Sequence, residues 1–176
     1  MQSSYTPEAV LSFTEPCSEF LCPLSANVYD IRFGNFRLRD MDSGNVLFEL
    51  ERDFEPQTEE SRFIQYSFPP EFLSLRTIGT QSYFSVGDQP VSNFRIIERH
   101  YFKNELLRSY DFNIDFLIPN TVNSREFIYE LPELSQEQMM DIIVSSWQTK
   151  SDTFFFANGQ LIMHVRAEYD YTGSFE

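Results

Sequence analysis

The sequence predicts an all-β protein, an antiparallel β-sandwich of about eight or nine strands with one or two short helices. Apolar and polar residues alternate over most of the chain, and turn residues separate the alternating runs. Aromatic side chains, which strands favour, are abundant, with 19 Phe and 9 Tyr among 176 residues. A chain of this length can bury a core without disulfides or metals, so we expect residues 1–176 to form a single domain.

The first 25 residues are expected to be an irregular N-terminal segment with one short helix. Thr6 can cap this helix, Pro7 suits its first position, and Glu8 favours its positive end. The following stretch holds the chain's two cysteines, Cys17 and Cys22. Two cysteines without a histidine cluster favour reduced thiols over a disulfide or a zinc site.

From residue 29 onward, turn signals divide a series of expected strands. Asp42-Ser43-Gly44 predicts a turn, and Asn158-Gly159 is the strongest hairpin signal in the chain. Residues 52–61 are expected to form a charged loop. The alternation places strands around residues 29–39, 46–50, 64–68, 73–77, 82–86, 94–102, 110–118, 127–131, 153–157 and 161–171.

One longer helix is expected after residue 135. Ser135 and Gln138 form a capping box, which marks a helix start. Helical spacing places Met139, Ile142, Ile143 and Trp147 on one stripe. We interpret this stripe as core packing rather than as part of a cofactor site.

The most informative stretch is the strand over residues 94–102. Every second residue of a strand points the same way, so Glu98 and His100 share a face with Phe94, Ile96 and Phe102. A buried charge costs several kcal/mol unless it is paired. Glu98 and His100 therefore either satisfy each other within a closed core or line a cavity that receives the polar end of a ligand.

Composition argues against several functions. A net charge of −14 disfavours binding to nucleic acid or anionic membranes, because phosphate recognition needs an excess of Lys and Arg. No apolar run approaches the ~20 residues that span a bilayer, and the polar N-terminus predicts neither a signal peptide nor a transit sequence. The chain lacks a Gly-rich phosphate loop, a G-x-S-x-G elbow, H-E-x-x-H and C-x-x-C. We therefore expect a soluble cytosolic protein that is not an enzyme and uses no metal or cofactor.

Four blocks of sequence resemble one family. The first runs from Ile31 through the RDMDSG motif at residues 39–44 to Glu49, and the second joins VGDQPV at 86–91 to NFRIIERHYF at 93–102. The SDTF motif at 151–154 and the LIMH motif at 161–164 echo the family's C-terminal hairpin. These blocks resemble the GMP-phosphodiesterase delta-subunit-like lipid-binding chaperones, and within them the "uncoordinated" branch that carries N-terminally acylated proteins.

The resemblance implies an immunoglobulin-like β-sandwich whose sheets are held apart by a hydrophobic pocket. It also implies a monomer that binds the myristoyl or lauroyl group of cargo such as G-protein α subunits, and that releases this cargo to a GTP-bound Arf-like small GTPase, in the cytoplasm and at cilia or sensory neurons. Matching the family's motifs predicts lipid-binding residues, of which Tyr66, Glu98 and His100 are the polar members. The full predicted set is Phe36, Leu38, Tyr66, Phe72, Phe94, Glu98, His100, Tyr129, Leu131, Phe155 and Tyr169.

Two other functions are compatible with this sequence. A filled β-sandwich could act as a protein-interaction adaptor, for instance toward kinases, with tight core packing and no lipid ligand. A prenyl-binding carrier is disfavoured because the motifs match the acyl-binding branch more closely. The pairing of Glu98 with His100 on an apolar face favours a cavity, and hence a carrier.

Overall fold

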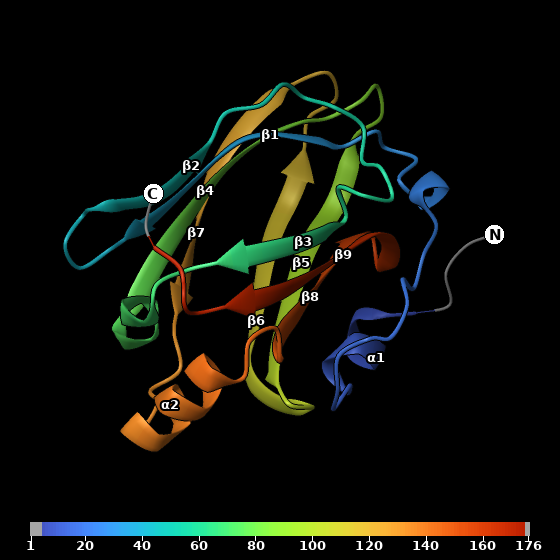
Figure 1. The fold of residues 1–176 in the computed structure, drawn as a ribbon. Helices are drawn as coiled ribbons and strands as arrows, with labels where there is room; N and C mark the ends of the chain where they lie inside the picture. Colours follow the sequence, from blue (N-terminus) through green and yellow to red (C-terminus); the bar gives the residue numbers. More distant parts are fainter. Residues whose placement is uncertain (1–4, 175–176) are drawn as a thin grey trace.

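Two β-sheets stacked face to face make up most of the molecule (Figure 1). The computed structural model describes residues 5–174, so residues 1–4 of the predicted N-terminal segment lie outside the described part. Within residues 5–174 the strands are β1 (Arg32–Asp40), β2 (Val46–Leu50), β3 (Phe63–Ser67), β4 (Thr77–Ser85), β5 (Val91–Phe102), β6 (Glu105–Leu117), β7 (Val122–Glu130), β8 (Thr149–Ala157) and β9 (Gln160–Asp170). The helical elements are α1 (Pro7–Leu11), α2 (Gln136–Val144), and the 3₁₀ turns η1 (Leu24–Ala26) and η2 (Pro70–Ser74).

The strands divide into a four-stranded sheet, ordered β2-β1-β4-β7, and a five-stranded sheet, ordered β3-β9-β8-β5-β6. The predicted β-sandwich is therefore confirmed. One pairing departs from the antiparallel expectation, because β3 runs parallel to β9. The chain reaches β3 by crossing from the four-stranded sheet, so no hairpin fixes its direction relative to β9.

The predicted turns join their strands as expected. Gly44 adopts a φ of +80° between β1 and β2, and its N–H donates to the carbonyl of Asp40 at 2.8 Å. Asn158 and Gly159 adopt φ values of 49° and 80° between β8 and β9. Positive φ at both central residues matches the twist of a two-residue hairpin, which explains the strength of this signal.

The strand predicted over residues 73–77 is wrong. Pro70 starts η2 instead, with the N–H of Phe72 donating to the carbonyl of Pro69 at 3.1 Å. Proline fixes φ near the helical value and has no N–H for a strand ladder. The next strand, β4, begins at Thr77 and extends through Ser85 without a break.

Both predicted helices are present, with the expected caps. The Thr6 side chain accepts from the N–H of Ala9 at 3.1 Å, and the Ser135–Gln138 capping box begins α2. Ile142 packs into the core, as the helical stripe predicted. Trp147, however, lies beyond the end of α2 with a φ of 66°, so it does not belong to that stripe.

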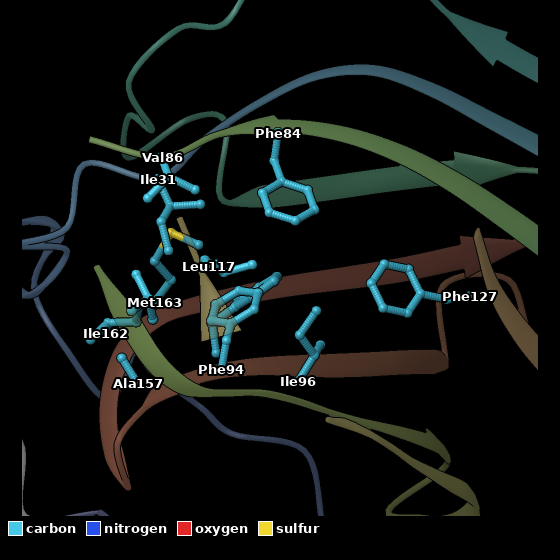
Figure 2. Packing of buried hydrophobic residues seen from close by; sticks show 12 residues of the cluster. Ile31, Phe84, Val86, Phe94, Ile96, Leu117, Phe127, Ala157, Ile162 and Met163 are labelled. Carbon is cyan, nitrogen blue, oxygen red and sulfur yellow. The ribbon is translucent and has the colours of Figure 1, made fainter. Parts of the chain in front are cut away.

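Two buried clusters lie between the sheets. The first gathers Phe84, Phe94 and Ile96 with other apolar side chains; Figure 2 shows Phe84 and Phe94 reaching toward each other from opposite strands. The second lies near η2 and α2 and includes Leu38, Phe72, Ile78, Ile142 and Tyr171. The space between the sheets is therefore filled by apolar side chains at both ends.

The N-terminal segment covers the outer face of the five-stranded sheet. Val10 and Cys22 pack there against Ile97, Phe154 and Phe156. Strands β5 and β8 are thus buried on both faces, and their inner faces contribute to the site described next. Both cysteines are free thiols, as expected.

Candidate functional site

A cavity of about 380 Å³ lies between the two sheets. Its wall combines members of the first core cluster, such as Ile96 and Phe155, with members of the second, such as Leu38 and Phe72. Side chains of both sheets therefore enclose it. Its volume falls in the range of about 300–1,000 Å³ that is typical of small-molecule sites.

Ten of the eleven residues predicted to bind lipid line this cavity: Phe36, Leu38, Tyr66, Phe72, Glu98, His100, Tyr129, Leu131, Phe155 and Tyr169. Phe94 lies outside the lining. Its ring packs in the first core cluster beside that of Phe84 (Figure 2). The centroid of the Phe94 ring lies 6.2 Å from that of Phe84 and 6.2 Å from that of Phe155. Phe94 faces the space between the sheets as predicted, but it lies in the part of that space that the first core cluster fills.

Glu98 is the polar centre of the cavity wall. Its Oε1 accepts a hydrogen bond from the Thr153 hydroxyl at 3.0 Å, and its Oε2 lies 3.3 Å from Nε2 of His100. The Tyr129 hydroxyl is a third partner. Glu98 and His100 therefore pair with each other and also line a cavity. The two alternatives that the sequence left open, a buried pair and a cavity lining, are thus both present.

The electrostatics of this cluster favour a charged carboxylate. Burial alone would raise the pKa of Glu98, but His100, Thr153 and Tyr129 together lower it below its ordinary value. Glu98 is thus ionised at neutral pH inside a mostly apolar cavity. A carboxylate held in this way can accept a hydrogen bond from an amide N–H of a ligand.

Four tyrosines surround this carboxylate. Burial, and then the charge of Glu98, raises the pKa of Tyr66 and of Tyr110 to about 12. The same two causes hold the pKa values of Tyr129 and Tyr169 well above the ordinary value. All four phenols are therefore neutral hydroxyls. The ring of Tyr66 stacks on that of Tyr169 at 5.4 Å, which extends a flat aromatic wall beside Glu98.

Some lining residues were not in the predicted set. Thr153 pairs directly with Glu98 across β5 and β8, and Tyr110 pairs with Glu98 across β5 and β6. The two-residue connection Lys103-Asn104 by itself predicts that Glu98 pairs with Ser109, but a bulge between His100 and Tyr101 shifts the β5–β6 register by one residue, so the turn did not identify Tyr110. Thr153 could not be found either, since β5 and β8 are far apart in sequence.

One polar atom of the lining has no protein partner. Thr149 is 3% exposed, and its Oγ1 makes no hydrogen bond within the described residues. Thr149 lies opposite Tyr169 in the β8–β9 register, on the same inner face as Ser151 and Thr153. The inner face of β8 therefore carries hydroxyl groups from its start at Thr149 to Thr153, which pairs with Glu98. Toward the end of β8 the cavity wall becomes apolar, with Phe155 and Met163.

A groove of about 470 Å³ adjoins the cavity between the edge strands β2 and β3. The cavity and the groove share Phe36, Arg52, Ser61, Ile64, Tyr66 and Phe68 as wall residues. The loop over residues 52–61 lies beside both, where Arg52 Nε donates to the carbonyl of Gly34 at 2.8 Å. The cavity and the groove are thus neighbouring spaces that share one wall.

Three potential metal ligands meet outside the cavity, on the outer face of the five-stranded sheet: Cys17, Asp152 and His164. The N–H of Leu21 donates to Nδ1 of His164 at 3.0 Å, so the ring proton is on Nε2 and is donated to Asp152 at 2.8 Å. A metal bound at Nε2 would require a proton on Nδ1, facing the Leu21 N–H. These hydrogen bonds instead attach the N-terminal segment to the sheet.

The thiol in this group is also held in its protonated form. Burial, with Asp152 as the next cause, raises the pKa of Cys17 to about 12. Burial likewise lowers the pKa of His164, so that its ring is neutral. We interpret the group as a structural contact between the N-terminal segment and β8 and β9.

Among residues 5–174, no helix combines the length and apolar character needed to cross a bilayer.

The comparisons with known proteins agree with each other. Residues 25–171 match the family model described as "GMP-PDE, delta subunit". The chain is 43% identical over 180 residues to Protein unc-119 homolog B of Danio rerio, which covers 96% of this chain and 74% of that protein. It is 44% identical over 177 residues to Protein unc-119 of Caenorhabditis elegans, covering 97% and 81%, and 43% identical over 180 residues to Protein unc-119 homolog B of Homo sapiens, covering 95% and 72%.

The family match includes every residue that lines the cavity, from Ile31 to Tyr171. The relatives are matched over more than two thirds of their own length. The chain therefore belongs to the GMP-PDE delta-subunit family of lipid-binding β-sandwiches, within its unc-119 branch.

Proposed function

We propose that this protein is a carrier for N-terminally acylated proteins. The cavity between the sheets takes the myristoyl or lauroyl chain of the cargo, and Glu98 with Tyr66 receives the amide that joins this chain to the N-terminal glycine. The observation that carries the proposal is the Glu98 carboxylate, held by Thr153 and His100 in the wall of a mostly apolar cavity. An acylated glycine offers the same combination, a long apolar chain that ends in a hydrogen-bonding amide.

The energetics allow such a carrier to compete with a membrane. About a dozen methylenes at roughly 0.8 kcal/mol each could gain up to ~10 kcal/mol on full burial. Loss of freedom on binding offsets much of this gain. A single myristoyl anchor binds a membrane only marginally, so the remainder is enough to bring the cargo into solution. The net charge of −14 also keeps the carrier away from anionic lipid.

The cargo we propose is the acylated N-terminus of proteins such as G-protein α subunits, and the release factor is a GTP-bound Arf-like small GTPase. Release requires only that the GTPase prefer a conformation of the sandwich with lower affinity for the lipid. The carrier acts as a cytoplasmic monomer without catalytic activity, and cilia or sensory neurons are its proposed setting.

The adaptor hypothesis requires a filled sandwich that is indifferent to lipid. A cavity of about 380 Å³ with polar groups in its wall is a poor fit to that requirement. A prenyl-binding carrier is also a poorer fit, since a prenyl group carries no amide for Glu98.

The test uses one fluorescent peptide from the N-terminus of a G-protein α subunit in three forms: myristoylated on glycine, farnesylated at a C-terminal cysteine, and unmodified. Fluorescence anisotropy against the full chain gives each affinity. We expect tight binding of the myristoylated form alone. Equal affinity for all three forms, or no binding of any, would contradict the proposal and leave the adaptor hypothesis.

A further inference from the structure

Thr149 provides a hydrogen-bonding position in the cavity wall that the proposed function does not use. Among the buried side-chain nitrogen and oxygen atoms of residues 5–174, its Oγ1 is the one without a hydrogen-bond partner. An unpaired buried hydroxyl destabilises a protein, and native structures contain few of them. Because Thr149 lines the cavity, a molecule bound there can supply the missing partner.

The neighbouring side chains on the sheet leave this hydroxyl free. Thr149 lies opposite Phe102 on β5 and opposite Tyr169 on β9. Phe102 has no polar side-chain atom, and the Tyr169 hydroxyl already bonds to Ser151 Oγ at 2.9 Å. The Thr149 hydroxyl can therefore both donate a hydrogen bond to a ligand and accept one from it.

The register of the sheet gives the separation between this hydroxyl and Glu98. Thr153 lies opposite Glu98 and bonds to its carboxylate. Thr149 lies four residues before Thr153 on β8, on the same inner face, and four residues of strand span about 13 Å. Thr149 thus offers a hydrogen bond about 13 Å from the Glu98 carboxylate.

The cavity extends from Glu98 toward Thr149. Phe102 and Tyr169, the two residues opposite Thr149, pack against the second core cluster. In the first cluster, by contrast, Phe84 and Phe94 lie outside the cavity lining, with their ring centroids 6.2 Å apart. A chain that starts at Glu98 therefore has room toward the second cluster, whose buried members all line the cavity: Leu38, Phe68, Phe72, Ile78, Ile142 and Tyr171.

An acyl chain can span the separation between Glu98 and Thr149. This step rests on the proposed function, in which the glycyl amide lies at Glu98. An extended alkyl chain advances about 1.3 Å per carbon, because its C–C bonds of about 1.5 Å alternate in direction. Roughly ten carbons therefore cover about 13 Å. At that point a plain alkyl chain has no polar atom to pair with Thr149.

We propose that Thr149 forms a second polar subsite in the cavity, which takes acyl chains that carry a hydroxyl group near the tenth carbon. The ligand hydroxyl pairs with Thr149 Oγ1, while the amide pairs with Glu98. The carrier then accepts both plain acyl chains and chains that are hydroxylated in their distal part. In the second case the buried hydroxyl of the protein is satisfied by its ligand.

The experiment compares dodecanoylglycinamide with 10-hydroxydodecanoylglycinamide by calorimetry, on the wild type and on Thr149→Val. A hydroxyl that enters an apolar cavity without a partner costs affinity. In the wild type Thr149 is that partner, so the hydroxylated ligand should bind within about threefold of the plain one. In Thr149→Val the ligand hydroxyl stays unpaired and should weaken binding by a further factor of about five to ten.

Two controls separate the subsite from general effects of the ligand or the substitution. The isomer 5-hydroxydodecanoylglycinamide carries its hydroxyl away from Thr149 and should lose the same affinity on both proteins. Thr77→Val removes a threonine hydroxyl from β4, outside the cavity lining, and should treat all three ligands as the wild type does. Binding of dodecanoylglycinamide by Thr149→Val with wild-type affinity shows that this variant is folded.

The outcomes distinguish this inference from the proposed function. If the 10-hydroxyl costs the same affinity on the wild type and on Thr149→Val, Thr149 bonds only with water, and the inference is wrong while the lipid carrier remains. If the 5-hydroxyl depends on Thr149 and the 10-hydroxyl does not, the position of the subsite along the chain is wrong, which also overturns the inference. If dodecanoylglycinamide fails to bind the wild type, the proposed function itself is wrong.

Discussion

Replacing Glu98 with glutamine tests the role of the buried carboxylate in ligand binding. The variant keeps the size of the side chain and an oxygen that can accept the hydrogen bond from Thr153. It removes the charge that His100, Thr153 and Tyr129 stabilise. Hydrogen bonds to charged groups contribute about 1.5–3 kcal/mol, against roughly 1 kcal/mol for neutral ones. Each 1.4 kcal/mol changes an affinity tenfold.

We therefore expect Glu98→Gln to weaken binding of a myristoylglycyl peptide by about 10- to 100-fold if the full charged hydrogen bond is lost. Fluorescence anisotropy with the labelled peptide measures the affinity, and circular dichroism checks that the variant is folded. Glu126→Gln is the matched control. Glu126 is also paired with a basic residue, Arg39, at 2.6 Å and 2.8 Å, but it does not line the cavity.

The control variant should bind the peptide as the wild type does. Unchanged affinity in Glu98→Gln, with the acyl chain still required for binding, would refute the reasoning. It would mean that Glu98 stabilises the fold through His100 and Thr153 and takes no part in recognition of the amide.

Three further predictions concern the cavity, its titration and one turn. Val165→Phe adds a ring that takes up space in the cavity wall, and it should weaken binding of the myristoylated peptide at least tenfold in the same anisotropy assay. The control Val46→Phe lies on the exposed part of β2 outside the cavity lining and should leave the affinity unchanged. The pKa of Glu98 is lowered in the folded state, so its charge stabilises the folded protein above the unfolded pKa of 4.5, and this contribution is lost as the pH falls below 4.5 through the folded pKa. Urea unfolding at several pH values should therefore show that the stability difference between the wild type and Glu98→Gln shrinks below pH 4.5. A stability difference that stays constant with pH would contradict this. Gly159→Ala places a Cβ at a φ of +80° with no other atom within 4 Å, so the substitution acts through backbone strain alone. Urea unfolding should show that the free energy of unfolding falls by about 1–2 kcal/mol. An unchanged unfolding midpoint would show instead that the turn relaxes to accept alanine.

Local patterns predicted most elements of this fold because each depends on neighbours in sequence. The alternation along 94–102 identified the inward face of β5, and Asn158-Gly159 identified the β8–β9 hairpin. The turn η2 was missed because Leu73 and Leu75 alternate with polar residues as a strand would, while Pro70 starts a 3₁₀ turn. The local pattern was compatible with a strand and with a 3₁₀ turn, and periodicity alone did not decide between them.

Long-range pairings could not be predicted in the same way. Nothing near β3 in sequence indicates that it runs parallel to β9, because that pairing joins segments about a hundred residues apart. Thr153 was missed as a partner of Glu98 for the same reason, since the β5–β8 register forms only in the folded sheet. The candidate site was thus predicted where family motifs supplied residues, and its hydrogen-bond network required the structure.

The central claim is that an acyl chain occupies the cavity between the sheets and that its glycyl amide meets Glu98. A crystal structure of the full chain with a myristoylglycyl peptide tests this claim most directly. The account predicts density for the acyl chain between the sheets, enclosed by Leu38, Phe72 and Phe155, with the glycyl amide nitrogen about 3 Å from the Glu98 carboxylate. Density for the acyl chain on the outer surface, with the space between the sheets closed by side chains, would contradict it.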